Sequence, residues 1–230
     1  MALRARTMED LLGPLERPRG GEFLVLTALC AASILGTYTG LDRRDAELLA
    51  RGHRFFAPAT FLDAYIPLWP WMVWVYLSYF VCFFVIMAVT LRDRRVMYEG
   101  TVAYVGCALG ATAIFAALPS RMDQPSLVGC QGVDCAVLGW FYRVDNGFHI
   151  FPSLHVAYPT VVWLFLARYL PRARAPVGLW VLAIWASTVL LRRHYLWDIP
   201  AGALLAVGAY ALGRRVGGPV ARALQRGKGA

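Results

Sequence analysis

Residues 66–90 read IPLWPWMVWVYLSYFVCFFVIMAVT, a run of 25 residues without a charged side chain. It is one of six apolar blocks, which cover residues 22–40, 66–90, 100–118, 152–170, 175–191 and 197–213. Each block has roughly the 17–25 residues that a helix needs to cross a hydrocarbon core of about 30 Å. A backbone in lipid must satisfy its own hydrogen bonds, which excludes irregular segments there. The sequence therefore predicts an all-α, polytopic integral membrane protein, in which six transmembrane helices form a single bundle.

The charged residues are few and are distributed unevenly between the connections. The chain of 230 residues is 59% hydrophobic and 16% charged, against about 25% charged in soluble domains. Of its Arg and Lys residues, 15 lie in the two terminal segments and the connections on their side, and 8 lie in the alternating connections. The positive-inside rule then predicts cytoplasmic termini, in a cell membrane such as the inner membrane of a bacterium. The net charge of +9 comes from basic residues that lie mostly at the span ends, where they would bind anionic lipid headgroups. We therefore expect the bilayer, and no nucleic acid, as a partner.

The domain organisation follows from the blocks. We expect a cytoplasmic N-terminal segment over 1–21, the six-helix domain over 22–213, and a basic cytoplasmic tail over 214–230. The first block has the length of a retained span, and the small-residue cleavage site of a signal peptide is poorly matched after it. Nothing in the sequence indicates an oligomeric state.

Two of the five cysteines, Cys130 and Cys135, share the 119–151 connection on the predicted external side. They would form a short disulfide in an oxidising compartment and would remain two free thiols otherwise. The sequence leaves both alternatives open.

Ionisable residues gather at the predicted external ends of the spans. His194 and Asp198 are four residues apart, which places them on one face if this stretch is helical. A carboxylate on one ring nitrogen fixes the tautomer and leaves the other nitrogen free as a nucleophile or base. Pro200 requires the sixth helix to begin near residue 196 or to be kinked there. His155 follows Pro152 and Ser153, which suit the first turn and the cap of the fourth helix.

Arginines on the same side predict an anion as the ligand. Arg121, Arg192 and Arg193 carry donor forks that match phosphate oxygens, and Ser153 lies at a helix N-terminus that would attract the same group. A zinc site built from His149, His155, His194 and Asp198 is the alternative. The chain has no His-Glu-x-x-His pattern and few external acids, so we expect no metal and no other cofactor.

Two stretches resemble the second and third signature motifs of the type 2 phosphatidic acid phosphatase superfamily. They are Pro152-Ser153-Leu154-His155 and His194-Tyr195-Leu196-Trp197-Asp198. Their form is closer to the branch that includes inositol phosphorylceramide synthases and, more distantly, sphingomyelin synthases. Other features that fit this branch are Leu62-Asp63, Ile66-Pro67, Pro70, Tyr76 and Ser187. The resemblance covers roughly residues 62–202.

The resemblance implies a phosphohistidine mechanism that needs no metal. His194 would attack phosphorus, Asp198 would orient it, and His155 would protonate the leaving alcohol. Arg121 and Arg192 would hold the non-bridging oxygens. The sequence departs from the pattern at Thr188, where the superfamily has an arginine, and it has no recognisable first-motif lysine ahead of Arg121, so Arg192 or Arg193 would substitute.

The expected activity is that of a membrane lipid phosphatase. It would hydrolyse a lipid phosphate monoester or diphosphate at the external leaflet, and its partner would be that lipid phosphate or phospholipid. A lipid phosphotransferase, which moves a phospho-headgroup to an alcohol, is the second interpretation. A non-catalytic lipid-binding or transport protein is the third.

Overall fold

The computed structural model describes residues 16–226, and this part of the chain is helical. It contains isolated β-bridges and no β-strand within those residues. The α-helices are α2 (Gly20–Ala50), α3 (Val73–Leu77), α4 (Tyr79–Thr90), α5 (Arg94–Ala117), α6 (Val133–Val144), α7 (Leu154–Tyr169), α8 (Arg174–Leu190) and α9 (Asp198–Arg226). Short 3₁₀ helices are η1 (Phe61–Tyr65), η2 (Pro70–Met72) and η3 (Pro171–Ala173).

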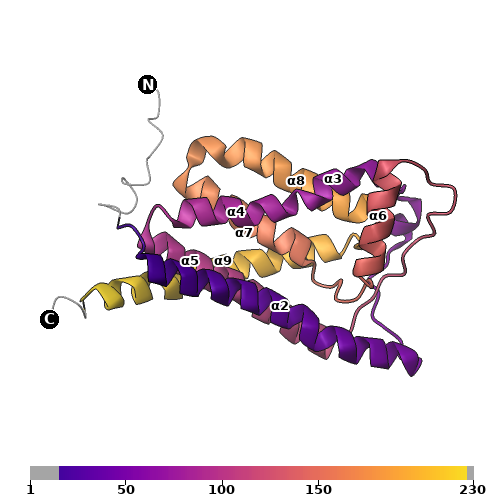
Figure 1. Ribbon diagram of the computed structural model, residues 1–230, viewed down its shortest axis with the longest axis horizontal. Helices are drawn as coiled ribbons and strands as arrows, with labels where there is room; N and C mark the ends of the chain where they lie inside the picture. The colour runs from indigo at the N-terminus through magenta and orange to yellow at the C-terminus, as the bar shows by residue number, and fades with distance from the viewer. Residues whose placement is uncertain (1–15, 227–230) are drawn as a thin grey trace.

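The long helices run roughly along one axis (Figure 1). The start of α2 and the end of α9 lie at one end of the bundle, and α6 with its flanking loops lies at the other. Most of the predicted N-terminal segment 1–21 lies outside the described residues. Of the predicted tail 214–230, residues 227–230 lie outside them. Within them, α9 continues to Arg226, so the described part of the tail is helical.

Four helical segments are long and apolar enough to cross a membrane: Gly20–Ala50, Pro70–Thr90, Arg94–Ala117 and Pro171–Leu190. They correspond to the first, second, third and fifth predicted spans, and they indicate a membrane protein. Helices α7 and α9 are not among the four within the described residues. At about 1.5 Å per residue, α7 is roughly 24 Å long, short of the hydrocarbon thickness. Six spans therefore remain a prediction.

Helix α7 forms the centre of the bundle. It packs against α4, α5, α8 and α9, and its buried side chains include Val161, Val162 and Phe165. Because protein rather than lipid surrounds it, α7 is held by packing on all sides. Its N-terminal end carries His155, so the core of the bundle positions one of the predicted site residues.

The helix pair α5 and α9 approaches closely because α9 carries small residues on the contact face. A Cβ atom added at Gly217 would lie 2.6 Å from the Cα of Glu99. Such close backbone approach at small residues is typical of helix pairs in membranes. The contact anchors α9, whose first residue, Asp198, belongs to the predicted site.

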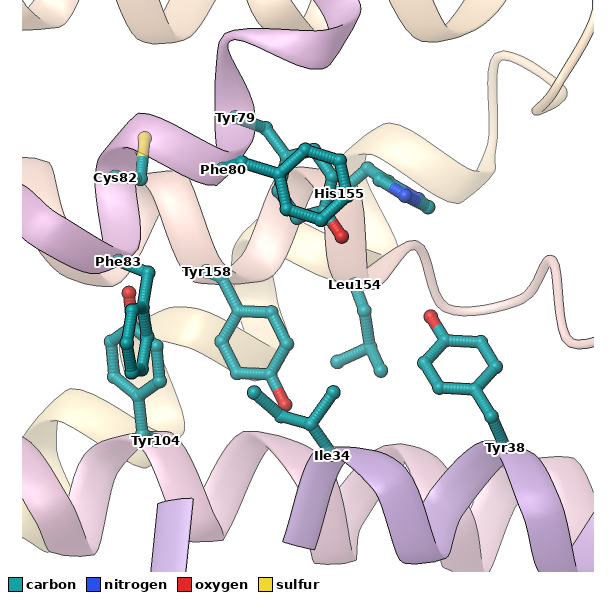
Figure 2. A pocket seen from close by; sticks show the side chains of 10 residues that line it. All are labelled: Ile34, Tyr38, Tyr79, Phe80, Cys82, Phe83, Tyr104, Leu154, His155 and Tyr158. Carbon is teal, nitrogen blue, oxygen red and sulfur yellow. The ribbon is translucent and has the colours of Figure 1, made fainter. Parts of the chain in front are cut away.

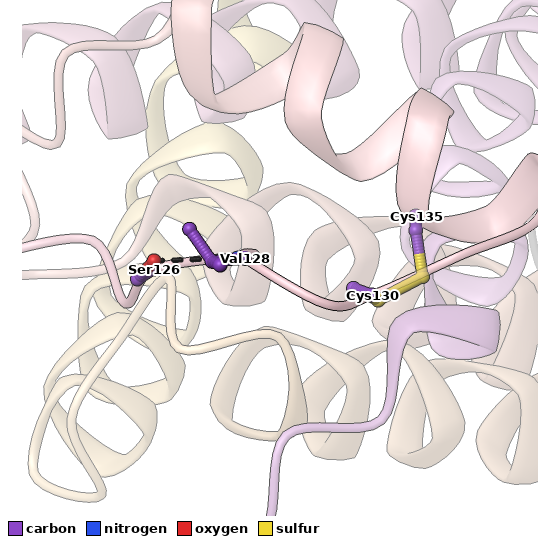
Figure 3. Close-up of a disulfide and its surroundings, with 4 residues drawn as sticks. All are labelled: Ser126, Val128, Cys130 and Cys135. Carbon is purple, nitrogen blue, oxygen red and sulfur yellow. Dashed lines mark hydrogen bonds between the residues drawn. A yellow bond between two sulfur atoms is a disulfide. The ribbon is translucent and has the colours of Figure 1, made fainter.

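The two cysteines of the 119–151 connection form a disulfide (Figure 3). Cys130 lies in the loop and Cys135 lies in the first turn of α6. The structure thus selects the disulfide over the two free thiols. It fastens the loop to α6 at the end of the bundle away from the start of α2 (Figure 1).

Candidate active site

The N-terminus of α7 provides the first part of the site. Ser153 is the N-cap of α7, and its Oγ accepts a hydrogen bond from the backbone amide of Val156. This confirms the predicted cap. Helix α9 begins directly beside it, and Gly202 permits the approach because a Cβ there would lie 2.5 Å from the Ser153 carbonyl oxygen. The starts of two helices therefore meet at Ser153.

His194 and Asp198 form the predicted pair, but they do so across a turn. His194 lies between α8 and α9, and its backbone amide donates to the Thr188 carbonyl at 3.2 Å. Asp198 is the first residue of α9, and Pro200 lies in the first turn, where a missing N–H costs little. The distance between His194 Nδ1 and Asp198 Oδ2 is 3.0 Å. The pairing agrees with the prediction, whereas a helix over 194–198 does not form, because α9 starts at Asp198.

The hydrogen bonds of His194 define its tautomer. Nδ1 faces two acceptors, the Ile150 carbonyl at 3.0 Å and the Asp198 carboxylate at 3.0 Å. A nitrogen between two acceptors must carry the proton, so Nε2 of the neutral ring has a free lone pair. Nε2 points at Ser153 Oγ, 3.1 Å away, and at His155 Nδ1, 3.3 Å away. This arrangement suits a nucleophile that a carboxylate orients from behind.

The second histidine is fixed from the opposite side by a tyrosine. His155 Nε2 lies 2.8 Å from the hydroxyl of Tyr76, and the two ring centroids are 4.7 Å apart. Tyr79 contacts the same imidazole edge-on, with ring centroids 4.6 Å apart. A hydroxyl that donates to Nε2 leaves the proton of His155 on Nδ1, the nitrogen that faces His194. The line from Tyr76 through both histidines to Asp198 is therefore continuous.

The three predicted phosphate-binding arginines all have partners in the structure. Arg192 donates to the backbone carbonyls of Asp63 at 2.7 Å and of Ile66. Asp63 in turn accepts from the amide of Leu196 at 2.9 Å. These bonds tie the His194 turn to the segment before the second span. Arg192 thus holds the loop in which His194 lies.

Arg193 and Arg121 form ion pairs. Arg193 is 4% exposed, pairs with Asp145, and lies over the ring of Phe141. Burial alone would raise the pKa of Asp145, but the guanidinium outweighs that effect and holds the pKa below its ordinary value. Arg121 pairs with the exposed Asp123 at 2.7 Å. Within the described residues, no hydrogen bond joins these arginines to either site histidine.

His149 lies apart from the histidine pair. Its Nδ1 is 3.4 Å from Asp42 and its Nε2 is 3.0 Å from Asp45, both on α2. Burial lowers the pKa of His149, and these two carboxylates offset that effect only in part. In the described part of the chain, no group of three or more His, Cys, Asp or Glu side chains is placed to hold a metal ion.

Two cavities meet at His155. The first, of about 130 Å³, is lined by side chains of α2, α4, α5 and α7 and is mostly apolar (Figure 2). The second, of about 230 Å³, reaches from His155 to the 141–149 segment and is more polar. Tyr38, Tyr79 and His155 line both. His155 thus contacts both an apolar and a more polar cavity, whereas His194 is not among the lining residues of either.

Sequence reasoning did not single out Asp145, and it treated Tyr76 and Asp63 only as features of the family resemblance, without a chemical role. Tyr76 is fully buried within an apolar span and is 79 residues from His155 in the chain. The residues around a tyrosine in such a span do not indicate whether it contacts a catalytic residue or only packs in the core. Only the tertiary contact reveals its role.

Comparison with known proteins gives one family match, over the segment that carries these motifs. The model of the PAP2 superfamily matches residues 135–212, about a third of the chain, which include both histidine motifs. The match supports membership of that superfamily and suggests phosphatase or phosphotransferase chemistry. No curated protein and no solved structure matches the chain.

Proposed function

We propose that the protein is a membrane lipid phosphatase that hydrolyses a lipid phosphate monoester or diphosphate through a phosphohistidine intermediate. One observation carries the proposal: Nε2 of His194 lies 3.3 Å from Nδ1 of His155, while Asp198 holds the opposite side of the His194 ring. These two nitrogens are in direct contact, so a bound phosphoryl group would displace that contact and then meet a nucleophile on one side and an acid on the other.

The reaction has two balanced steps. In the first step His155 acts as an imidazolium: Nε2 of His194 forms a bond to phosphorus as the bond from phosphorus to the leaving oxygen breaks, and His155 gives that oxygen its Nδ1 proton and becomes neutral. His155 then takes a proton from water, whose oxygen bonds to phosphorus as the phosphorus–nitrogen bond to His194 breaks. The Asp198 carboxylate stabilises the positive charge on the His194 ring throughout.

The phosphate oxygens need donors at this point. The N-terminus of α7 offers partial positive charge beside Ser153. Among the arginines, Arg121 has the most accessible ion pair, because the side chain of its partner Asp123 is 87% exposed. We propose that Arg121 binds the phosphate oxygens directly. Arg192 and Arg193 would contribute positive electrostatic potential at the site from a longer distance.

The apolar cavity supports a lipid as the substrate. It adjoins His155 and lies between α2 and α4, two segments that are apolar enough to face lipid. Figure 2 shows Ile34 and Tyr38 of α2 on one side of it and Tyr79, Phe80 and Phe83 of α4 on the other. A hydrocarbon chain there would leave its phosphate beside the histidines.

The orientation of the protein rests on two features. The basic residues favour cytoplasmic termini, and the Cys130–Cys135 disulfide favours an oxidising compartment for the loop that carries it. We place the histidine pair at the external leaflet, in an integral membrane protein with six spans.

Purified protein in detergent and chelator tests the proposal. Wild type should release phosphate from lipid phosphates, whereas His194→Ala should release none although it remains folded. His53→Ala is the matched control, because His53 is exposed and lies outside the site. Near-normal release by His194→Ala would refute the mechanism, and loss of wild-type activity in chelator would favour the zinc alternative.

The polar cavity favours one further candidate, a phosphotransferase with an alcohol in place of water. The two functions share both histidine steps and differ in what lies in this cavity during the second step. A lipid product without free phosphate in the same assay would identify the transferase, and the absence of both products would favour a non-catalytic protein.

A further inference from the structure

His149 is buried and its backbone is strained, although it lies apart from the two site histidines. The residue is 4% exposed, and its φ of +58° falls in the left-handed region. Residues other than glycine rarely adopt this conformation, and they keep it only where their surroundings hold it. Gly147 also has a positive φ, of +74°, so the chain turns sharply over 147–149. The contacts of His149 must hold this turn in place.

Two carboxylates of α2 contact the His149 ring. Nε2 lies 3.0 Å from Asp45 Oδ2, and Nδ1 lies 3.4 Å from Asp42 Oδ1. The contact with Asp45 has the distance of an ion pair without the alignment of a hydrogen bond, and neither of its two atoms has a hydrogen-bond partner among the described residues. Burial of a polar atom without a partner is costly, so each of these atoms compensates for the burial of the other.

The end of α5 and the loop after it hold the same residue. The His149 amide donates to the Ser120 carbonyl at 3.0 Å, and the ring stacks on Phe115 with centroids 5.1 Å apart. Arg44 donates to the Phe115 carbonyl at 3.0 Å and to Asp45 at 2.8 Å. The imidazole therefore lies in a frame that joins α2 to the end of α5.

The next residue connects this turn to the proposed nucleophile. The Ile150 carbonyl accepts a hydrogen bond from His194 Nδ1 at 3.0 Å, and Ile150 is 2% exposed. It shares the Nδ1 proton with Asp198, which is also 3.0 Å away. Because each peptide unit is planar, a change in the backbone of His149 moves the Ile150 carbonyl.

We propose that His149 is a positioning residue: held by Asp42 and Asp45, it keeps the Ile150 carbonyl against the ring of His194. We call these three residues of α2 and the loop the clamp. The inference rests on the proposed function and adds a second acceptor to the one that Asp198 provides. When the clamp is broken, the carbonyl moves away from Nδ1, the ring turns more freely, and Nε2 is aimed at phosphorus less often.

Steady-state turnover of the full chain measures the effect of the clamp. His149→Phe keeps the stack on Phe115 and loses both nitrogens, whereas Asp45→Asn keeps the shape and loses the charge. We expect each variant to lower kcat for a lipid phosphate about tenfold, as loss of one hydrogen bond would do. KM should change by less than about twofold, because neither residue lines the apolar cavity that we assign to the lipid chain.

The members of the clamp should act as a unit. The double variant His149→Phe with Asp45→Asn should lose no more activity than either single variant, because breaking the contact from either side has the same consequence. His149→Gln should retain more activity than His149→Phe, since it keeps a donor on a side chain of similar length. Asp42→Asn should cost less than Asp45→Asn, because the Asp42 side chain is 47% exposed and the solvent screens its charge.

Thr37→Val is the matched control for a general loosening of α2. Thr37 is 2% exposed, and its hydroxyl lies 2.7 Å from that of Thr112 on α5. The variant therefore also removes a buried polar contact between α2 and α5, roughly two turns before Asp45. It should keep kcat and KM even if its melting temperature falls. Equal loss of activity in Thr37→Val and Asp45→Asn would overturn the proposal.

A spectroscopic measurement tests the clamp without turnover. The chain has four histidines, so labelling with ¹⁵N-histidine in detergent gives few ring signals, and His194→Ala identifies those of His194. The Nδ1 proton of His194 should move upfield in His149→Phe and in Asp45→Asn, because it loses one of two acceptors. It should not move in Thr37→Val. An unmoved resonance in both folded clamp variants would overturn the proposal, even if kcat fell.

The outcomes separate this inference from the proposed function. His194-dependent phosphate release that stays within about twofold of wild type in His149→Phe and Asp45→Asn would overturn the inference and leave the proposed function intact. Absence of phosphate release from wild type, together with the shift of the His194 resonance in these variants, would overturn the proposed function and still support the clamp.

Discussion

Replacement of Tyr76 by phenylalanine isolates the hydrogen bond that fixes His155. The side chain is 0% exposed, and its hydroxyl lies 2.8 Å from His155 Nε2. The phenyl ring keeps the contact with the imidazole and with Phe141, so the packing survives. Only the hydroxyl is lost, and with it the group that keeps the proton of His155 on Nδ1.

The magnitude follows from the burial of this bond. Leaving a buried partner unsatisfied costs about 1–3 kcal/mol, and each ~1.4 kcal/mol in the barrier is tenfold in rate. We therefore expect kcat to fall about 10- to 100-fold in Tyr76→Phe. KM should change little, because the hydroxyl contacts His155 and lines neither cavity.

Tyr169→Phe is the control for a purely structural effect. Tyr169 is also 0% exposed, and its hydroxyl donates to Glu99 at 2.7 Å, away from the site histidines. Phosphate release should be measured for both variants over a range of lipid phosphate concentrations, alongside their melting temperatures. If Tyr76→Phe keeps kcat within twofold of wild type, or if both variants lose activity equally, the positioning role of Tyr76 is refuted.

Three further predictions address stability and topology. Burial lowers the pKa of His149 in the folded protein, whereas the unfolded chain has the ordinary histidine pKa of about 6.5. The melting temperature should therefore decline as pH falls from about 7 to 5, because the unfolded state binds a proton that the folded state resists. The decline should be shallower in His149→Gln, and an unchanged slope in that variant would contradict the prediction. Gly217→Ala should destabilise the protein by about 1–3 kcal/mol because its Cβ meets the backbone of α5, whereas Gly208→Ala, with nothing within 4 Å, should not; equal melting temperatures would disprove the close contact. A membrane-impermeant thiol reagent added to intact cells should label Cys130 and Cys135 only after reduction; labelling only after the membrane is opened would reverse the orientation.

The sequence predicts the helices best where a long apolar run marks them. The blocks 22–40, 66–90, 100–118 and 175–191 correspond to helices that are long and apolar enough to cross a membrane, because a membrane span needs a long run of apolar residues. Bounds were less predictable. Helix α2 continues to Ala50 because polar residues are tolerated once a helix leaves the hydrocarbon, and hydropathy alone does not mark that extension.

Local spacing predicted the core of the site, and tertiary contacts determined the rest. The structure brings together Ser153, His155, His194 and Asp198, which two short motifs had singled out. The His194–Asp198 contact is made across a turn and not on a shared helix face, because the last helix begins only at Asp198, close to the start near residue 196 that Pro200 indicated. The partners of the arginines, and the role of Tyr76, depend on segments that meet only after folding.

The central claim is that His194 carries the phosphoryl group. The most direct measurement is peptide mass spectrometry of protein quenched during turnover of a lipid phosphate. It compares wild type with His194→Ala, with His155→Ala to slow breakdown of the intermediate, and with His53→Ala as the control. We predict a phosphoryl adduct on His194 that accumulates in His155→Ala and is absent from His194→Ala. An adduct on Ser153 or His155, or sustained turnover in which the His194 peptide is never modified, would contradict the account.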